Sequence, residues 1–263
     1  SSLGNLFLAK EETKEQSVAL PRIHIVPDWR SKDRMKTVAV GLVCALNVGT
    51  DPPDVVKPNP CAVLECWTDP TKMSRAKARD TIVEKLETQY KNWQPARAQL
   101  KYRNALDPTL FEVRDLCLRL RKDAKHERVL FHYNGHGVPR PTAMGEIWVF
   151  DKNHTAYIPC PVSDIKEWMG QPAMVVLDCS SAAVLMHAFT QMSENWVRDT
   201  IVLAPCAENE VLPLHPDYPA DLFTSCLTTP IPMALRWFLL RNPALGFSPD
   251  IVDKIPGQAN DRK

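Results

Sequence analysis

Short, uninterrupted runs of apolar residues alternate along the chain with segments in which apolar residues recur every three or four positions. The apolar runs cover residues 37–48, 128–133, 174–177 and 200–204. Continuous runs of this length are typical of strands buried on both faces of a parallel sheet, whereas the wider spacing is typical of helices packed on such a sheet. The alternation predicts an α/β domain with a mostly parallel central sheet.

Six segments are predicted to be helical. In residues 74–90 one helical face is formed by the apolar residues Ala78, Ile82, Val83, Leu86 and Tyr90. A second helix is expected to begin at Asp107, since an N-cap residue followed by proline favours a helix start. The remaining helices are predicted over 162–169, 182–189, 221–227 and 231–240.

Smaller extended elements complete the pattern. Residues 62–67 are expected to form a short strand or an extended piece, and 97–102 a further strand. Residues 146–150 and 155–158 are predicted to form a β-hairpin. We expect three domain segments: an N-terminal arm over 1–36, the α/β domain over 37–245 and a C-terminal segment over 246–263. Residues 191–198 are interpreted as a loop or the remainder of a longer insertion.

Composition narrows the class of protein. The 263 residues carry a formal net charge of +1, which argues against strong attraction to nucleic acid or membrane surfaces. No stretch is apolar enough to predict a transmembrane helix. The eight cysteines are scattered without a C-x-x-C pair, as expected of reduced thiols in a cytoplasmic protein. The first residue is not Met, so we expect a fragment of something longer.

Two predicted strands end in chemically capable side chains. His136 follows the strand over 128–133, and Cys179 follows the strand over 174–177. Because the carboxyl ends of parallel strands meet at one edge, the two side chains are expected to lie close together, as a nucleophilic thiol needs. The N–H groups of Gly137 and Cys179 would stabilise an oxyanion. However, Asp178 directly precedes the thiol and disfavours the thiolate, so a structural histidine and a buried cysteine remain the alternative.

Other kinds of site are poorly supported. A metal site built from His132, His136 and Cys179 lacks a nearby carboxylate with supporting spacing, and we expect no metal. Gly135 and Gly137 have neither the lysine nor the spacing of a phosphate-binding loop, and no cofactor is expected.

Longer motifs point to a family. Residues 132–142, His-Tyr-Asn-Gly-His-Gly-Val-Pro-Arg-Pro-Thr, and 145–150, Gly-Glu-Ile-Trp-Val-Phe, resemble the conserved N-terminal region of the Raptor family. Further similar segments lie at 34–37, 47–57, 90–95, 220–231 and 254–257, so the resemblance covers nearly the whole chain from about residue 20.

This resemblance implies a caspase-like α/β fold, a three-layer sandwich in which His136 and Cys179 occupy the dyad positions. Caspases carry Gln-Ala-Cys-x-Gly around the cysteine, whereas this chain has Leu-Asp-Cys-Ser-Ser, so the dyad is expected to be vestigial. The family is regarded as a non-catalytic scaffold of the target-of-rapamycin kinase complex, which presents substrates carrying a Phe-led acidic motif. The resemblance further implies that the full-length chain continues into a helical-repeat solenoid and a β-propeller. It also implies that the protein works in the cytoplasm and is recruited to the lysosomal or vacuolar surface.

Three hypotheses therefore stand, the third being a small-molecule sensor that keeps the dyad pocket for binding, for which the sequence names no ligand. In the first, the domain is a pseudo-protease scaffold that helps to place kinase substrates, with Trp148, Tyr157 and Trp168 as candidate partner-binding residues because aromatic side chains dominate interface hot spots. In the second, it is a caspase-like cysteine endopeptidase, which requires His136 and Cys179 to face one open cleft.

Overall fold

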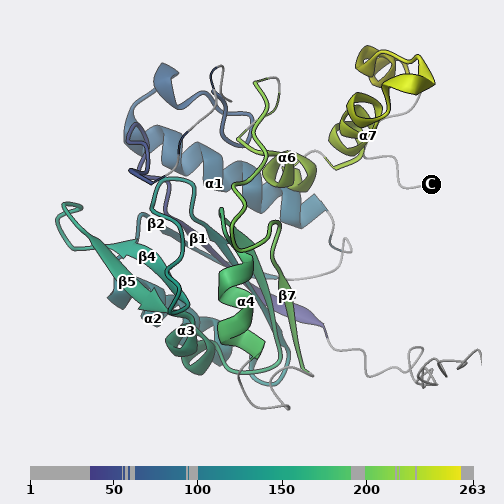
Figure 1. Cartoon of the computed structure of the whole chain (residues 1–263). Helices are drawn as coiled ribbons and strands as arrows, with labels where there is room; N and C mark the ends of the chain where they lie inside the picture. The colour runs from purple at the N-terminus through teal and green to yellow at the C-terminus, as the bar shows by residue number, and fades with distance from the viewer. Residues whose placement is uncertain are drawn as a thin grey trace, which may run out of the picture. The chain divides into compact units, whose positions relative to one another are not determined.

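A five-stranded parallel sheet forms the centre of the computed structural model (Figure 1). The structure describes residues 36–54, 56, 59, 63–92, 94, 100–190, 199–216, 218, 220–228 and 230–255. The expected arm, apart from residue 36, and the segment 191–198 lie outside these residues. The strands, in the order in which they pair, are β2 (Lys101–Leu106), β1 (Thr37–Cys44), β3 (Arg128–Asn134), β6 (Ala173–Asp178) and β7 (Thr200–Leu203).

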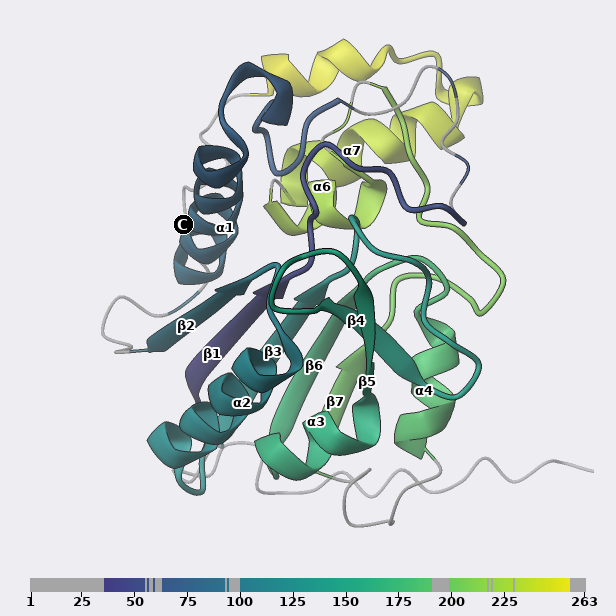
Figure 2. The same cartoon turned by 90° about the vertical axis from the view of Figure 1, so that its left-hand side faces the viewer.

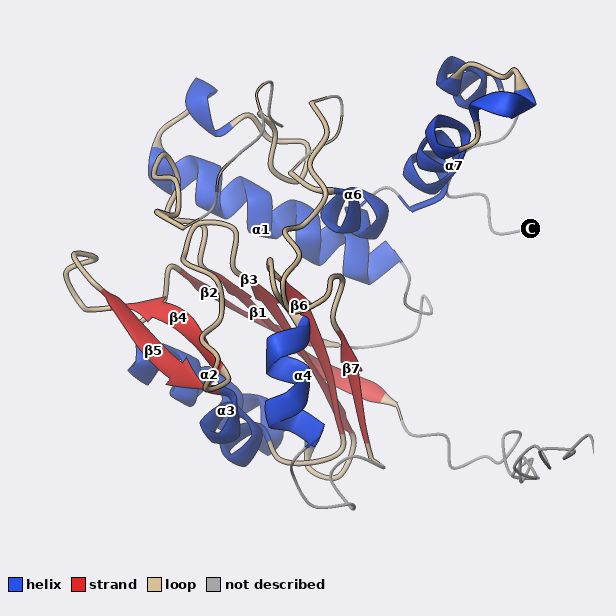
Figure 3. Cartoon of the chain, viewed as in Figure 1, coloured by secondary structure: helices blue, strands red, loops and turns tan. Residues whose placement is uncertain are grey.

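Helices cover both faces of this sheet and make a three-layer sandwich (Figures 2 and 3). On one face lie α1 (Arg75–Asn92) and α6 (Leu222–Thr228); on the other lie α2 (Leu110–Ala124), α3 (Val162–Met169) and α4 (Ala183–Thr190). Alternate residues of β3 enter the two cores: Phe131 and Tyr133 pack with α2, whereas Leu130 packs with α1. The predicted α/β fold with a mostly parallel sheet is confirmed.

The predicted hairpin is also present. Strands β4 (Glu146–Phe150) and β5 (Tyr157–Pro161) pair antiparallel as a separate two-stranded sheet. Tyr133 ties the hairpin to the central sheet, because its hydroxyl donates to the Trp148 carbonyl oxygen at 2.9 Å. The chain then ends in α7 (Pro230–Arg241) and the short helices η3 (Pro243–Leu245) and η4 (Pro249–Lys254), which follow α6.

Two predicted boundaries are wrong. Helix α2 is capped by Thr109, which forms a capping box with Glu112, so Asp107 is not its N-cap. Asp107 instead has a left-handed backbone (φ 46°) and accepts hydrogen bonds from the backbone N–H groups of Leu46 and Asn47. The strand expected over 97–102 is β2, which begins at Lys101; residues 97–99 lie outside the described part of the chain. In the 62–67 segment, the described residues form only a bridge between Glu65 and Thr68.

Candidate functional site

His136 lies at the carboxyl edge of the sheet, and neighbouring backbone contacts fix its position. Its own N–H donates to Asn134 Oδ1 at 3.0 Å. Gly135 N–H donates to the Asp178 carbonyl oxygen, and Gly137 N–H to the Ala45 carbonyl oxygen, both at 2.9 Å. These bonds join the turn after β3 to the ends of β6 and β1. A Cβ on Gly137 would lie 1.8 Å from a backbone carbonyl oxygen, so only glycine fits there.

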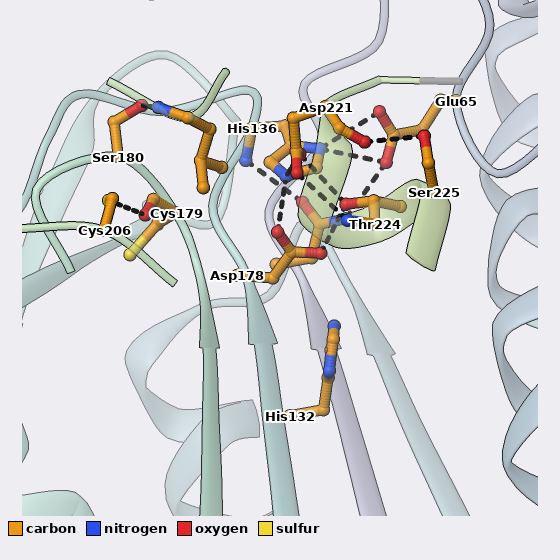
Figure 4. A network of polar contacts seen from close by, with 12 residues as sticks. Glu65, His132, His136, Asp178, Cys179, Ser180, Cys206, Asp221, Thr224 and Ser225 are labelled. Atoms are coloured by element: carbon orange, nitrogen blue, oxygen red, sulfur yellow. Dashed lines mark hydrogen bonds and ion pairs between the residues drawn. The ribbon is translucent and has the colours of Figure 1, made fainter. Parts of the chain in front are cut away.

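The imidazole of His136 is surrounded by three carboxylates (Figure 4). Its Nε2 lies 3.0 Å from Asp178 Oδ1 and 3.0 Å from Asp221 Oδ2, and its Nδ1 lies 2.9 Å from Glu65 Oε1. Asp178 ends β6, Asp221 precedes α6, and Glu65 comes from the bridge segment before α1. Both ring nitrogens therefore contact acidic oxygens from three different parts of the chain.

These contacts decide the charge of the ring. Burial acts to lower the pKa of His136, but Glu65 and Asp178, assisted by Asp221, outweigh burial and hold that pKa well above its ordinary value. His136 is consequently an imidazolium at neutral pH. A general base must be neutral to accept a proton, so this environment does not suit that role.

Asp178 and Asp221 share one hydroxyl group. Thr224 Oγ1 lies 2.7 Å from Asp178 Oδ2 and 3.0 Å from Asp221 Oδ2, yet a hydroxyl carries a single hydrogen. Burial raises the pKa of Asp178 to about 6, against the lowering effect of His136. The pKa of Asp221 is lowered, because hydrogen bonds from His136 and Thr224 outweigh its burial. Asp178 is thus the member of the pair that takes up a proton first, after which it can donate to Thr224.

Cys179 is buried and its thiol is not activated. Its exposed fraction is 3%, and burial, followed by the nearby Asp178 charge, raises the pKa of the thiol. The nearest helix, α4, begins at Ala183, four residues further on, which is too far for its N-terminus to stabilise a thiolate. A helix that began near Ser181, which would have placed its N-terminus at the thiol and favoured the thiolate, is not formed.

The segment after β7 covers the Cys179 turn. Ser181 N–H donates to the Glu210 carbonyl oxygen at 2.8 Å, and Leu212 N–H donates to Ser180 Oγ at 3.2 Å. Cys206 Sγ lies 3.4 Å from the Cys179 carbonyl oxygen. The loop thus packs on this turn, and Cys179 lines the same pocket as His136.

The expected oxyanion donors are also engaged. Gly137 N–H bonds to Ala45, as described above, and Cys179 N–H donates to the Leu177 carbonyl oxygen at 3.1 Å. With both donors directed into the protein, neither is aimed at a reacting carbonyl group. His136 and Cys179 lie at neighbouring strand ends and line one pocket, as the sequence predicts, but His136 bonds to carboxylates and the thiol of Cys179 is buried with a raised pKa.

The structure does not bring His132, His136 and Cys179 together as one set of possible metal ligands. His132 lies one layer deeper, fully buried, where its Nδ1 contacts Tyr90 Oη at 3.0 Å and burial lowers its pKa to about 3. The donor atoms that approach each other are those of His136, Asp178 and Asp221. Sequence reasoning missed Glu65, Asp221 and Thr224, since nothing local in the chain links them to His136.

The three aromatic candidates for partner binding are half-buried. Trp148 donates from Nε1 to the Arg140 carbonyl oxygen at 2.9 Å. Tyr157 accepts from Asn47 Nδ2 at 3.2 Å, and Trp168 packs against the core below the hairpin face. Their packing contributes to the domain, and their part in partner binding stays a prediction.

Comparison with known proteins gives consistent matches. Residues 35–189 match the family model described as "Raptor N-terminal CASPase like domain". The chain is 50% identical over 264 residues to "Regulatory-associated protein of TOR 1" of Arabidopsis thaliana, covering 97% of this chain and 19% of that protein. It is 44% identical over 258 residues to "Target of rapamycin complex 1 subunit mip1" of Schizosaccharomyces pombe, covering 90% and 19%.

A solved structure agrees. The crystal structure of Chaetomium thermophilum Raptor matches with a TM-score of 0.72 at 44% sequence identity, covering 89% of this chain and 21% of that one. The chain therefore spans about a fifth of the length of the relatives it matches. The caspase-like fold inferred from sequence is confirmed.

Proposed function

The chain belongs to the family of Raptor N-terminal caspase-like domains, and we propose that it is a non-catalytic scaffold domain of a target-of-rapamycin kinase complex. The relatives named above are a regulatory-associated protein of TOR and a subunit of its complex 1. In this role the domain helps to recruit substrates that carry a Phe-led acidic motif and to position them for the kinase, which performs the chemistry.

The observation that carries the non-catalytic assignment is the environment of His136. Three carboxylates hold the imidazole as a cation, whereas a cysteine protease needs a histidine that exchanges a proton with its thiol. The thiol of Cys179 is buried and the covering loop bonds to the turn around it. In this proposal the dyad positions have become structural: the histidine joins β3, β6, α6 and the Glu65 segment by charge.

The C-terminal helices support a contact with a helical-repeat region. Helix α7 and η4 pack on each other, and large apolar side chains of α7 and of the residues on either side of η4 are exposed. Phe238 is 53% exposed, Phe247 56% and Ile255 52%. Repeat helices bury such faces only by stacking on their neighbours. We propose that this surface packs against the solenoid that the family carries, and that residues 246–263 lead toward it.

The proposed function also implies a cellular compartment. The cysteines that the structure describes are free thiols, as in a reducing compartment. None of the described helices is long and apolar enough to cross a membrane. We propose that the protein works in the cytoplasm, and that partner proteins recruit it to the lysosomal or vacuolar surface.

The test uses the full-length protein carrying Cys179→Ala, assembled with its kinase. After a thermal melt has shown that the fold survives, phosphorylation of a substrate with the acidic motif is compared between the variant and the parent protein. We expect equal phosphorylation. Loss of phosphorylation with an intact fold would assign the thiol a chemical role and favour the cysteine endopeptidase hypothesis.

A further inference from the structure

A pocket opens above the carboxylate cluster at the carboxyl edge of the sheet. Its volume is about 180 Å³, which suits one long side chain rather than a whole folded partner. Five connecting segments contribute its walls, those after β1, β3, β6 and β7 and the segment before α1, so that His136 and Cys179 both line it. Leu46, Val63, Val138 and Leu212 are among the apolar residues that line it.

The floor of this pocket is acidic. Glu65, His136 and Asp221 line it, and Asp178 lies directly beneath, bonded to His136. Three carboxylates thus face a single imidazolium, which leaves an excess of negative charge in a partly buried position. Such charge in a setting of reduced dielectric attracts a cation more strongly than the same charge in water.

Glu65 has capacity for a further donor. It accepts hydrogen bonds from Asn134 Nδ2 at 3.1 Å and from His136 Nδ1 to both of its oxygens. A carboxylate offers about four lone-pair sites, so an incoming N–H group can still be accommodated. Its side chain is 15% exposed, in contrast to the 1% of Asp221, so it is the carboxylate that a ligand reaches first.

Among the described residues that line the pocket, Arg140 is the only arginine or lysine. Arg140 lines the pocket, but its Nε lies 3.1 Å from Asp54 Oδ2 and its backbone N–H bonds to the same oxygen at 2.9 Å. Its guanidinium is therefore offset by a carboxylate of its own.

We propose that this pocket binds an arginine or lysine side chain of an extended peptide. The aliphatic stem of such a residue packs against the apolar walls while its charged head reaches the carboxylates, as basic side chains do at apolar surfaces with a polar end. Arginine fits best, because its planar guanidinium pairs with carboxylates through parallel hydrogen bonds. The inference stands independently of the kinase, since it concerns only this chain and a peptide.

The experiment measures peptide binding to the purified protein by fluorescence anisotropy. Four labelled peptides differ only at their central residue, which is arginine, lysine, norleucine or glutamate. Norleucine keeps the aliphatic stem and lacks the charge. A charge-assisted hydrogen bond favours the basic peptides by about tenfold or more, so we expect arginine and lysine to bind at least about tenfold more tightly than norleucine, and glutamate not to bind.

Two variants localise the effect. Glu65→Gln keeps the shape and is expected to weaken the arginine peptide by about tenfold while leaving the norleucine peptide unchanged. Val63→Arg places a basic side chain at the mouth, where Val63 is 57% exposed, and is expected to abolish preference for the basic peptides. Val56→Arg is the matched control, because Val56 is 90% exposed and does not line the pocket.

Each outcome decides the proposal. Equal affinity for arginine and norleucine would overturn it, and so would an unchanged arginine affinity in a Glu65→Gln protein that still unfolds cooperatively. Mass spectrometry of the recovered peptide separates binding from catalysis. An intact peptide agrees with both proposals, whereas cleavage beside the basic residue would support the pocket and overturn the non-catalytic function.

Discussion

Replacing His136 by glutamine tests whether this residue is structural. Each ring nitrogen faces carboxylate oxygens at 2.9–3.0 Å, and the attraction amounts to roughly 5–6 kcal/mol for each pair at an effective dielectric constant of about 20, before desolvation is subtracted. Removing one partner of a buried charge pair typically costs about 3–5 kcal/mol, because the remaining charges stay buried and uncompensated. We therefore expect His136→Gln to lower the free energy of unfolding by about 3–5 kcal/mol.

The assay is urea denaturation followed by circular dichroism at pH 6. This pH is chosen because the folded pKa of His136 is raised, so its contribution to stability is fully present below the unfolded pKa of about 6.5. In a thermal melt the same loss corresponds to a fall in Tm of roughly 6–20 °C. Such a loss is a large part of the stability of a typical domain, about 5–15 kcal/mol.

His187→Gln is the matched control. His187 also contacts a carboxylate, that of Glu208, but both side chains are exposed, so we expect a cost of less than about 1 kcal/mol. Glu65→Gln should fall between the two, since glutamine keeps an acceptor for Asn134 and His136 and reduces the excess negative charge. If His136→Gln cost no more than the His187 control, the carboxylate cluster would not be holding the domain together and the reasoning would fail.

Three further predictions follow from the same geometry. Alkylation with iodoacetamide at pH 8, read by mass spectrometry, should modify the buried Cys179 at less than about a tenth of the rate of the half-buried Cys226; equal rates would contradict its burial and raised pKa. Gly137→Ala should cost more than about 3 kcal/mol in urea denaturation, because its Cβ would lie 1.8 Å from a backbone carbonyl oxygen, and a normal midpoint would refute that close approach. Imidazole NMR should find His136 protonated at pH 7.5 and His132 neutral at pH 5.5, and the reverse charge states would contradict both environments. Because the pKa of His136 is raised in the folded protein, its contribution to stability fades as pH rises. Because the pKa of His132 is lowered, its contribution fades as pH falls below about 6.5.

The central sheet could be predicted from sequence because its signal is local. Buried parallel strands appear as continuous apolar runs, and β1, β3, β6 and β7 all lie where such runs occur. The helices on the sheet likewise carry their apolar face in their own spacing: every apolar position assigned to the face of α1 is buried. No long-range information was needed for these elements.

The start of α2 shows where local signals compete. Asp107 followed by proline and Thr109 followed three residues later by Glu112 are both helix-start patterns. The tertiary structure decides between them, because Asp107 is drawn to the N–H groups at the end of β1 and to Arg79 Nη1 at 3.1 Å. Thr109 is then left to cap the helix.

The cluster around His136 could not be predicted, because its members are distant in sequence. Glu65 is 71 residues from His136, and Asp178 is 42 residues away. Sequence placed Asp178 correctly beside Cys179 and indicated its effect on the thiol. It could not show that Glu65 and Asp221 converge on the same ring, since that convergence depends on how a bridge segment and a short helix pack over the sheet edge.

The same convergence gives His136 a role in the fold that does not depend on catalysis. A histidine and a cysteine lie at neighbouring strand ends, as expected. They would form a catalytic pair if the histidine were neutral and the thiol were accessible. Asp178 acts against both conditions at once: it contributes to holding His136 as a cation and it raises the pKa of the adjacent Cys179. A cation fixed between three carboxylates stabilises the packing of α6 and the Glu65 segment on the sheet. His136 therefore has a structural role at this edge of the sheet that requires no peptidase activity.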